Sequence, residues 1–130
     1  MTNFEIAVNM VESLMDVIVN VPCKIVTPKE MPIKNSKGVY ASKEEMIYLL
    51  ENSTLEHAIH EIGHWIHEKQ FKDEMFRFDT EGRSAYSKVN HFENFAENFM
   101  DTVQKLHKVG NKKVWLKRNE QMKQLMIKVS

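Results

Sequence analysis

The sequence predicts one compact α+β domain over residues 1–130, in which four helices accompany a small sheet. Three observations support this class. Apolar residues recur at helical spacing in four segments, and short β-branched or apolar runs lie between the first two of these segments. A chain of this length also buries roughly two-thirds of the surface that its unfolded form exposes, which allows one hydrophobic core. The single cysteine, Cys23, has no partner within the chain, so we expect a reduced thiol and no disulfide.

The N-terminal half begins with a predicted helix over residues 3–19, which three short strands follow. The apolar stripe of this helix consists of Phe4, Ala7, Val8, Val11, Leu14, Met15 and Ile18. Pro22 is expected to end the helix, and β-branched residues indicate a strand within residues 21–27. Two apolar runs, residues 38–41 and 46–50, are separated by four polar residues, which indicates a β-hairpin.

Three further helices are predicted. The first covers about residues 54–70, and Ser53 and Glu56 at its start have the spacing of a capping box. The next helix carries the stripe Phe92, Phe95, Ala96, Phe99, Met100, Val103 and Leu106. It is expected to end at Gly110. The last helix is expected over about residues 112–128, with Trp115, Met122, Leu125, Met126 and Val129 on one side.

The helix predicted over residues 54–70 contains His60-Glu61-Ile62-Gly63-His64, an H-E-x-x-H sequence. A four-residue step turns a helix by about 40° beyond one full turn, so both imidazoles lie on one face and can bind one metal ion. Neutral imidazole suits zinc, so we expect Zn²⁺ as the cofactor. Glu61 lies beside the pair and can take a proton from a zinc-bound water, whose pKa is lowered to about 7. This pattern is typical of metal-assisted hydrolysis.

The helix after the central loop offers a third ligand. Glu93 and Glu97 are four residues apart and therefore share one helix face. One of these carboxylates can bind the metal while the other orients a ligand histidine through a hydrogen bond.

Two more histidines lie on the H-E-x-x-H helix. The rise along a straight helix prevents His57 and His67 from joining the H-E-x-x-H pair around a tetrahedral ion. We interpret both as polar residues at the rim of the site or as hydrogen-bond partners of its ligands. The longer metal motif that continues with Gly and then His is absent, since Gln70 stands where that histidine would fall.

Residues 36–100 resemble the protease domain of anthrax toxin lethal factor and its relatives, including the Pro-Pro endopeptidases, a branch of the gluzincin metallopeptidases. The resemblance lies in the H-E-x-x-H sequence, in Tyr86 seven residues before Glu93, and in Glu93-Asn94-Phe95-Ala96-Glu97. The predicted hairpin is also similar in kind. The resemblance covers half of the chain and implies a compact zincin-like (gluzincin) domain with a small sheet, an active-site helix, a glutamate helix and a C-terminal helix.

The resemblance also implies a role for each matching residue. His60, His64 and Glu93 would bind zinc, and Glu61 would be the general base. Tyr86 would donate a hydrogen bond to the oxyanion of the tetrahedral intermediate. The predicted function is therefore a zinc-dependent metalloendopeptidase that hydrolyses a protein or peptide substrate. We expect the strand formed by Met46, Ile47, Tyr48, Leu49 and Leu50 to be the upper edge of the cleft and to bind the substrate by strand addition.

Two other functions remain open on the sequence. A deformylase also carries H-E-x-x-H and completes its metal site with an upstream cysteine, a position that Cys23 could take. However, Val21-Pro22-Cys23-Lys24 lacks the Glu-Gly-Cys-Leu-Ser context of that family. The second alternative is a non-catalytic protein-binding module that zinc stabilises, although structural zinc usually has four protein ligands.

Charge and hydropathy restrict the partners and the compartment. Residues 1–103 carry 10 Lys and Arg against 17 Asp and Glu, whereas residues 104–130 carry 8 against Glu120 alone. We expect the basic tail to pack on the acidic body, and we expect no nucleic-acid partner because no binding motif accompanies these basic residues. Glu12 and Asp16 interrupt the early apolar stretch, which argues against a membrane span and a signal peptide. We therefore expect a cytoplasmic protein, with export by a non-classical route left open. We also expect a monomer.

Overall fold

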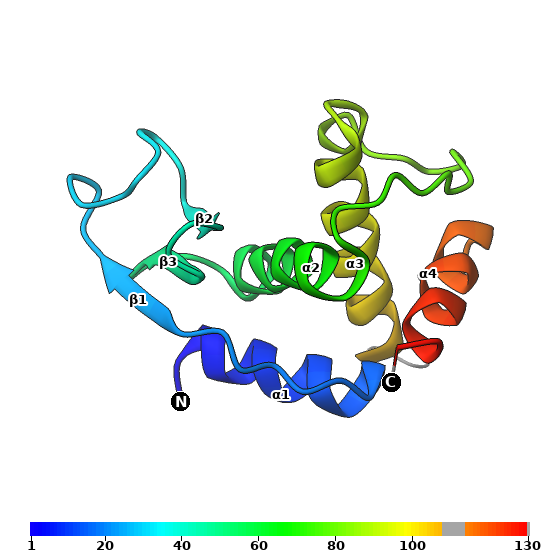
Figure 1. Cartoon of the computed structure of the whole chain (residues 1–130), viewed down its shortest axis with the longest axis horizontal. Helices are drawn as coiled ribbons and strands as arrows, with labels where there is room; N and C mark the ends of the chain where they lie inside the picture. The colour runs from blue at the N-terminus through cyan, green and yellow to red at the C-terminus, as the bar shows by residue number, and fades with distance from the viewer. Residues whose placement is uncertain (108–113, 130) are drawn as a thin grey trace.

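The computed structural model describes residues 1–107 and 114–129. These ranges contain four α-helices, one 3-10 helix (η1) and a three-stranded sheet, in the order α1, β1, β2, β3, α2, η1, α3, α4 (Figure 1). The α+β class predicted from the sequence is confirmed. None of the helices in these two ranges combines the length and the apolar character needed to cross a membrane.

Helix α1 spans Asn3–Met15 and is four residues shorter at its C-terminus than predicted. It ends because Asp16 adopts the left-handed backbone conformation, with φ of 53°, which aspartate tolerates better than most residues. The chain has therefore left the helix well before Pro22. Ile18, predicted on the apolar stripe, is 79% exposed. The predicted helix end at Pro22 and the predicted burial of Ile18 are wrong.

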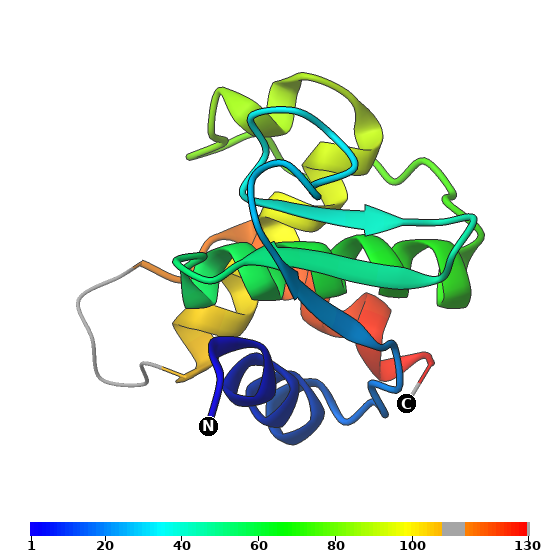
Figure 2. The ribbon, with the colours of Figure 1, turned by 90° about the vertical axis from the view of Figure 1, so that its left-hand side faces the viewer.

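The sheet consists of β1 (Cys23–Val26), β2 (Gly38–Ala41) and β3 (Met46–Leu50), in the order β1-β3-β2. Strands β2 and β3 are antiparallel, which confirms the predicted hairpin, and β1 pairs in parallel with β3. Figure 2 shows the sheet lying across α2, with β1 and β2 at its two edges.

Helix α2 spans Leu55–Phe71. Its capping box lies one residue later than predicted, because Thr54 and not Ser53 is the N-cap: the Thr54 hydroxyl accepts the backbone N–H of His57 at 3.2 Å. In return, Nδ1 of His57 accepts the backbone N–H of Thr54 at 3.1 Å. His57 therefore takes the capping-box position that was predicted for Glu56.

Three elements follow α2: η1 (Tyr86–Lys88), α3 (His91–His107) and α4 (Lys117–Ile127). The predicted helix end at Gly110 and the predicted start of the last helix at residue 112 lie outside the described residues. Trp115 was expected on the last helix but precedes it. The helix begins later because the Asn119 side chain accepts the backbone N–H of Leu116 at 3.0 Å and so caps its first turn.

Helix α2 lies at the centre of the fold, between the sheet, α1 and α3 (Figure 1). Its buried apolar residues are Ala58, Ile59, Ile62, Trp65 and Ile66. Gly63 marks the closest approach to α3, where an added Cβ would lie 3.0 Å from Cδ1 of Phe99 and 3.3 Å from Cα of Ala96. Because Gly63 belongs to the H-E-x-x-H sequence, this close packing holds the two histidines beside α3.

Candidate metal centre

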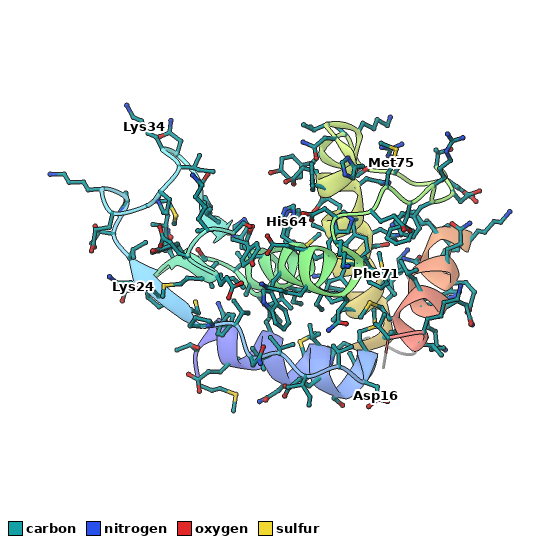
Figure 3. All side chains as sticks on the ribbon, in the orientation of Figure 1. Asp16, Lys24, Lys34, His64, Phe71 and Met75 are labelled. Atoms are coloured by element: carbon teal, nitrogen blue, oxygen red, sulfur yellow. The ribbon has the colours of Figure 1, made fainter. Side chains whose placement is uncertain are left out.

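Three side chains from two helices converge above α2. His60 and His64 lie one turn apart on α2, and Glu93 lies in the first turn of α3. The Nε2 atoms of the two histidines are 3.1 Å apart, and the two oxygens of the Glu93 carboxylate lie 3.0 Å from them, Oε2 from His60 and Oε1 from His64. Figure 3 shows His64 on the side of α2 that faces the space between the loop carrying Lys34 and the segment carrying Met75.

These three side chains fit a metal ion. Their ligand atoms all lie within 4.8 Å of one another. Ligand atoms bound to a tetrahedral zinc ion are about 3.3 Å apart, because each zinc–ligand bond is about 2.0–2.1 Å long. The separations found here are close to that value. Two imidazoles and one carboxylate are also a donor set of catalytic zinc sites, in which one coordination position stays open.

Glu97 lies behind His60 and controls its orientation. His60 donates its Nδ1–H to the Glu97 carboxylate at 2.9 Å, which directs Nε2 toward the other ligands. Burial disfavours a charged His60, but the carboxylates of Glu93 and Glu97 outweigh burial and raise its pKa to about 9. Burial would raise the pKa of Glu93, but hydrogen bonds to His60 and His64 hold it well below its ordinary value. The site therefore favours positive charge, which a divalent cation would supply.

Glu61 lies next to the ligands on α2 and is 8% exposed. Its Oε1 accepts the backbone N–H of Tyr40 on β2 at 2.9 Å. Burial raises the pKa of Glu61, while the neighbouring His64 and His60 act in the opposite direction. A carboxylate with a raised pKa accepts a proton more readily, so this position suits a general base.

Tyr86 comes from η1 and reaches the same centre from outside α2. Its ring centroid lies 5.6 Å from that of His60, and the residue is 55% exposed. Partial burial and the nearby Glu93 carboxylate raise the pKa of Tyr86 to about 12. The phenol therefore keeps its proton at neutral pH and can donate a hydrogen bond.

A cleft passes over the metal centre in two parts. One part has a volume of about 320 Å³ and extends past the ligands to Glu68. The other part has a volume of about 420 Å³, runs the opposite way along α2 and ends at His57. Gly38, Glu61 and Tyr86 line both parts. The metal centre therefore lies in the middle of the cleft and not at a closed end.

The structure corrects the expected substrate-binding strand. Met46, Ile47, Tyr48, Leu49 and Leu50 form β3, which is paired with β1 on one side and with β2 on the other. They cannot be an edge of the cleft, so that prediction is wrong. The edge strand beside the metal centre is β2, where Gly38 and Tyr40 line the cleft. A hairpin pattern alone does not reveal this, because the parallel pairing of β1 with β3 depends on a crossover that joins strands distant in sequence.

Glu68 is a residue of the cleft that the sequence analysis missed. It lies one turn beyond His64 on α2 and accepts hydrogen bonds from the hydroxyls of Tyr40 and Ser42. Together with Glu61, Glu68 connects β2 and the residue after it to α2 by hydrogen bonds. The spacing of Glu61, His64 and Glu68 on one helix face was a usable signal for this role.

The remaining candidate residues lie away from the ligands. His57 lines the far end of the cleft and caps α2. His67 is 1% exposed and stacks on Phe95 with ring centroids 4.1 Å apart, so it does not lie at the rim. Its Nε2 bonds the Glu74 carbonyl and not a candidate ligand, so both interpretations of His67 are wrong. Cys23 lies on β1, and β3 and β2 separate it from the cleft. A deformylase-like site, which would need Cys23 as a ligand, is therefore not formed by these residues.

The candidate metal centre thus contains the residues predicted from the sequence, from two helices and one 3-10 turn. His60, His64 and Glu93 offer ligand atoms, and Glu97 orients His60. Glu61 and Tyr86 line the cleft next to them. No protein-family model, curated protein or solved structure matches the chain.

Proposed function

We propose that this protein is a zinc-dependent metalloendopeptidase with a zincin-like (gluzincin) fold, which hydrolyses peptide bonds of a protein or peptide substrate. One observation supports this most: Glu61 and Tyr86 line the same open cleft beside three ligands of the catalytic type. A zinc ion that served only to stabilise the fold would more often have four protein ligands. It would also have no use for a buried carboxylate beside it.

Each residue then has a defined task. His60, His64 and Glu93 hold zinc, which when bound supplies the Lewis-acid polarisation that makes water a nucleophile at neutral pH. Glu61 takes a proton from the attacking water and later gives it to the leaving amine. The Tyr86 phenol donates a hydrogen bond to the negative charge that develops on the former carbonyl oxygen.

The substrate binds in this proposal as an extended strand beside β2. Backbone groups of an edge strand point alternately toward its neighbour and outward. The outward N–H of Tyr40 donates to Glu61, so a peptide would pair with the other outward backbone groups of β2. A peptide that adds to this edge gains main-chain hydrogen bonds, while side-chain contacts select its sequence. Ile33, Val39 and Phe92 line the cleft and offer apolar contacts for substrate side chains.

Replacement of Glu61 by Gln tests the proposed function. Glutamine keeps the size of the side chain but cannot take a proton, so we expect zinc content and melting temperature to persist while hydrolysis falls by roughly 10²- to 10⁴-fold. The substrate comes from a peptide library digested with the wild-type protein and read by mass spectrometry. A wild type that binds zinc and cleaves nothing, while it binds a protein partner, would instead establish the non-catalytic module.

A further inference from the structure

We propose that Arg118 is a positioning residue, which from helix α4 holds the segment of residues 81–88 so that Tyr86 stays over the metal centre. This inference rests on the proposed function, because Tyr86 has a catalytic task only there. It assigns a role to the basic C-terminal helix that the charge pattern of the sequence did not indicate.

The Arg118 side chain binds backbone carbonyl oxygens at the start of the segment. Its Nε donates to the carbonyl oxygen of Glu81 at 3.2 Å, and its Nη2 donates to the carbonyl oxygen of Gly82 at 3.2 Å. The Gln121 side chain on the same helix accepts the backbone N–H of Asp79 at 2.8 Å. Helix α4 therefore holds the chain just before η1 at two points.

Hydrogen bonds within the segment also join residues on the two sides of Tyr86. The Ser84 hydroxyl accepts the Ser87 backbone N–H at 3.1 Å, and the Ser87 hydroxyl donates to the Ser84 carbonyl at 2.8 Å. Arg83 donates to the Ser87 carbonyl at 2.8 Å and to its hydroxyl at 3.2 Å. Because these bonds enclose Tyr86, a shift of residues 81–83 would carry the phenol with it.

The same segment reaches the metal ligands through one side chain. The Ser84 hydroxyl donates to Oε1 of Glu97 at 3.2 Å, and the other oxygen of Glu97 accepts the Nδ1–H of His60 at 2.9 Å. Arg118 is thus connected to the metal centre by a short series of contacts. Displacement of a catalytic group by as little as about 1 Å can lower turnover by about 10²-fold.

Arg118 is held rigidly enough to serve as such an anchor. Its side chain is 11% exposed and lies 3.0 Å from Oδ2 of Asp101, and Nη1 donates to the Asn98 side chain at 3.2 Å. Both partners belong to α3, the helix that also carries Glu93 and Glu97. The planar guanidinium therefore joins α3 to residues 81–82, and a lysine ammonium could not reach all four acceptors at once.

Lys105 provides a matched control. It pairs with the same Asp101 carboxylate at 3.0 Å and donates to Asn119 at 2.9 Å, but no contact to residues 79–88 is formed by its side chain in the described part of the chain. Lys105→Met therefore removes the other ion pair of Asp101, together with a hydrogen bond from α3 to Asn119 on α4, while it leaves the segment anchored.

The experiment compares the zinc-loaded, full-length wild type with Arg118→Met, Arg118→Lys and Lys105→Met. Hydrogen–deuterium exchange is expected to rise over residues 79–88 in both Arg118 variants and to stay unchanged there in Lys105→Met. On a peptide that the wild type cleaves, kcat is expected to fall about tenfold or more in Arg118→Met, with KM within about twofold and zinc content unchanged. Tyr86→Phe added to Arg118→Met is expected to lower kcat much less than it does in the wild type, since both changes act on one interaction.

Three results would overturn the proposal: unchanged exchange over residues 79–88, an equal loss of kcat in Lys105→Met, or full additivity of the Tyr86 and Arg118 effects. Arg118→Lys keeps the ion pair with Asp101, so it provides the exchange measurement if Arg118→Met fails to fold. A wild type without turnover would refute the proposed function, and the exchange data alone would then decide whether Arg118 holds the segment.

Discussion

His60 carries hydrogen bonds on both ring nitrogens, and each bond has a different consequence. The bond from Nδ1 to Glu97 fixes the orientation of the ring. The bond from Nε2 to Glu93 lies where a metal ion would bind between these two side chains. We therefore expect one zinc per chain in the wild type and none in His60→Ala, His64→Ala or Glu93→Ala. Glu97 is not one of the proposed ligands and acts on the ion only through the orienting bond to His60, so Glu97→Gln is expected to weaken zinc affinity by about 10- to 100-fold without abolishing it.

Metal analysis by mass spectrometry and competition with a chelator measure these affinities. Cys23→Ser is the control, because Cys23 lies on the far edge of the sheet and its zinc content is expected to match that of the wild type. Full zinc in a folded Glu93→Ala protein would remove Glu93 from the ligand set. Loss of zinc in Cys23→Ser would instead indicate that Cys23 is a ligand, as in a deformylase-like site.

In the proposed mechanism Tyr86 differs from the three ligands, because its hydroxyl would act in the transition state only. Tyr86→Phe removes one oxygen and leaves a partly exposed ring that still packs near His60. We expect kcat to fall by about 10²-fold or more while KM and zinc content change little. Steady-state kinetics on the library-derived peptide provide the measurement, and a variant with wild-type kcat would exclude Tyr86 from oxyanion stabilisation.

His67 makes stability depend on pH. Burial lowers its pKa from the ordinary value of 6.5, and Nε2–H donates to the Glu74 carbonyl at 2.7 Å. The unfolded chain therefore binds a proton at His67 more readily than the folded chain, so stability is lost as pH falls below about 6.5. In His67→Phe, which keeps an aromatic ring against Phe95, we expect a smaller fall in melting temperature from about pH 7.5 to about pH 5.5 than in the wild type.

Thermal unfolding of both proteins at the two pH values measures the difference. The variant is expected to be less stable at every pH, because the Glu74 carbonyl loses its donor, but that loss does not change with pH. Equal falls in the two proteins would contradict a neutral, buried His67.

Residue identity and spacing were sufficient to predict which side chains meet at the candidate metal centre, but not every neighbour of these side chains. His60 and His64 are local to one turn of helix, and Glu93 and Glu97 follow the same rule on α3. The contacts of His67 could not be predicted in this way, because its burial depends on Phe95, which lies 28 positions away. Glu68 was within reach of the same helical spacing, since it follows His64 by one turn.

The elements were predicted more accurately in their type than in their ends. Local backbone chemistry decides the ends: Asp16 stops α1, Thr54 starts α2, and Asn119 caps α4. The hairpin of β2 and β3 follows from short-range pattern, whereas the place of β3 in the middle of the sheet follows from long-range pairing with β1. For this reason the hairpin pattern alone led to the wrong expectation that β3 is an edge strand.

Gly63 illustrates how the packing of two helices overrides helix propensity. Alanine is preferred over glycine inside a helix by roughly 1 kcal/mol, so propensity alone predicts that Gly63→Ala stabilises α2. However, the added Cβ would lie 3.0 Å from Phe99 and 3.3 Å from the backbone of Ala96. We expect the clash to dominate and to lower the free energy of unfolding by about 1–3 kcal/mol.

Urea unfolding of the metal-free protein measures this change, and zinc affinity should fall as well because α2 moves relative to Glu93. Gln70→Ala is a suitable control: it changes an exposed position of the same helix and is expected to alter stability by less than about 0.5 kcal/mol. A more stable Gly63→Ala protein would show that α2 and α3 adjust their distance without cost.

At the scale of the whole molecule, the uneven distribution of charge along the chain leads to specific ion pairs and not only to a general attraction between the basic tail and the acidic body. Arg118 on α4 and Lys105 on α3 both pair with Asp101 on α3, so basic residues near the C-terminus bind one partly buried carboxylate. Burial would raise the pKa of Asp101, but Asn119, Lys105 and Arg118 hold it below its ordinary value. Charge counting along the sequence predicted that the tail packs on the body, but it could not locate this contact, which depends on the fold.

The course of the cleft across the molecule predicts where the proposed endopeptidase would cut its substrate. The cleft extends from the metal centre both toward Glu68 and toward His57, so an extended peptide can continue past the cleaved bond in both directions. An exopeptidase instead binds a charged chain end near the metal, and loss of such a buried charge contact costs about 2–5 kcal/mol. We therefore expect peptides with acetylated and amidated ends to be cleaved with kcat/KM within about threefold of the free peptides, at the same internal bond. Mass spectrometry of both digests measures this, and a strong preference for free ends would mean that the protein acts as an exopeptidase.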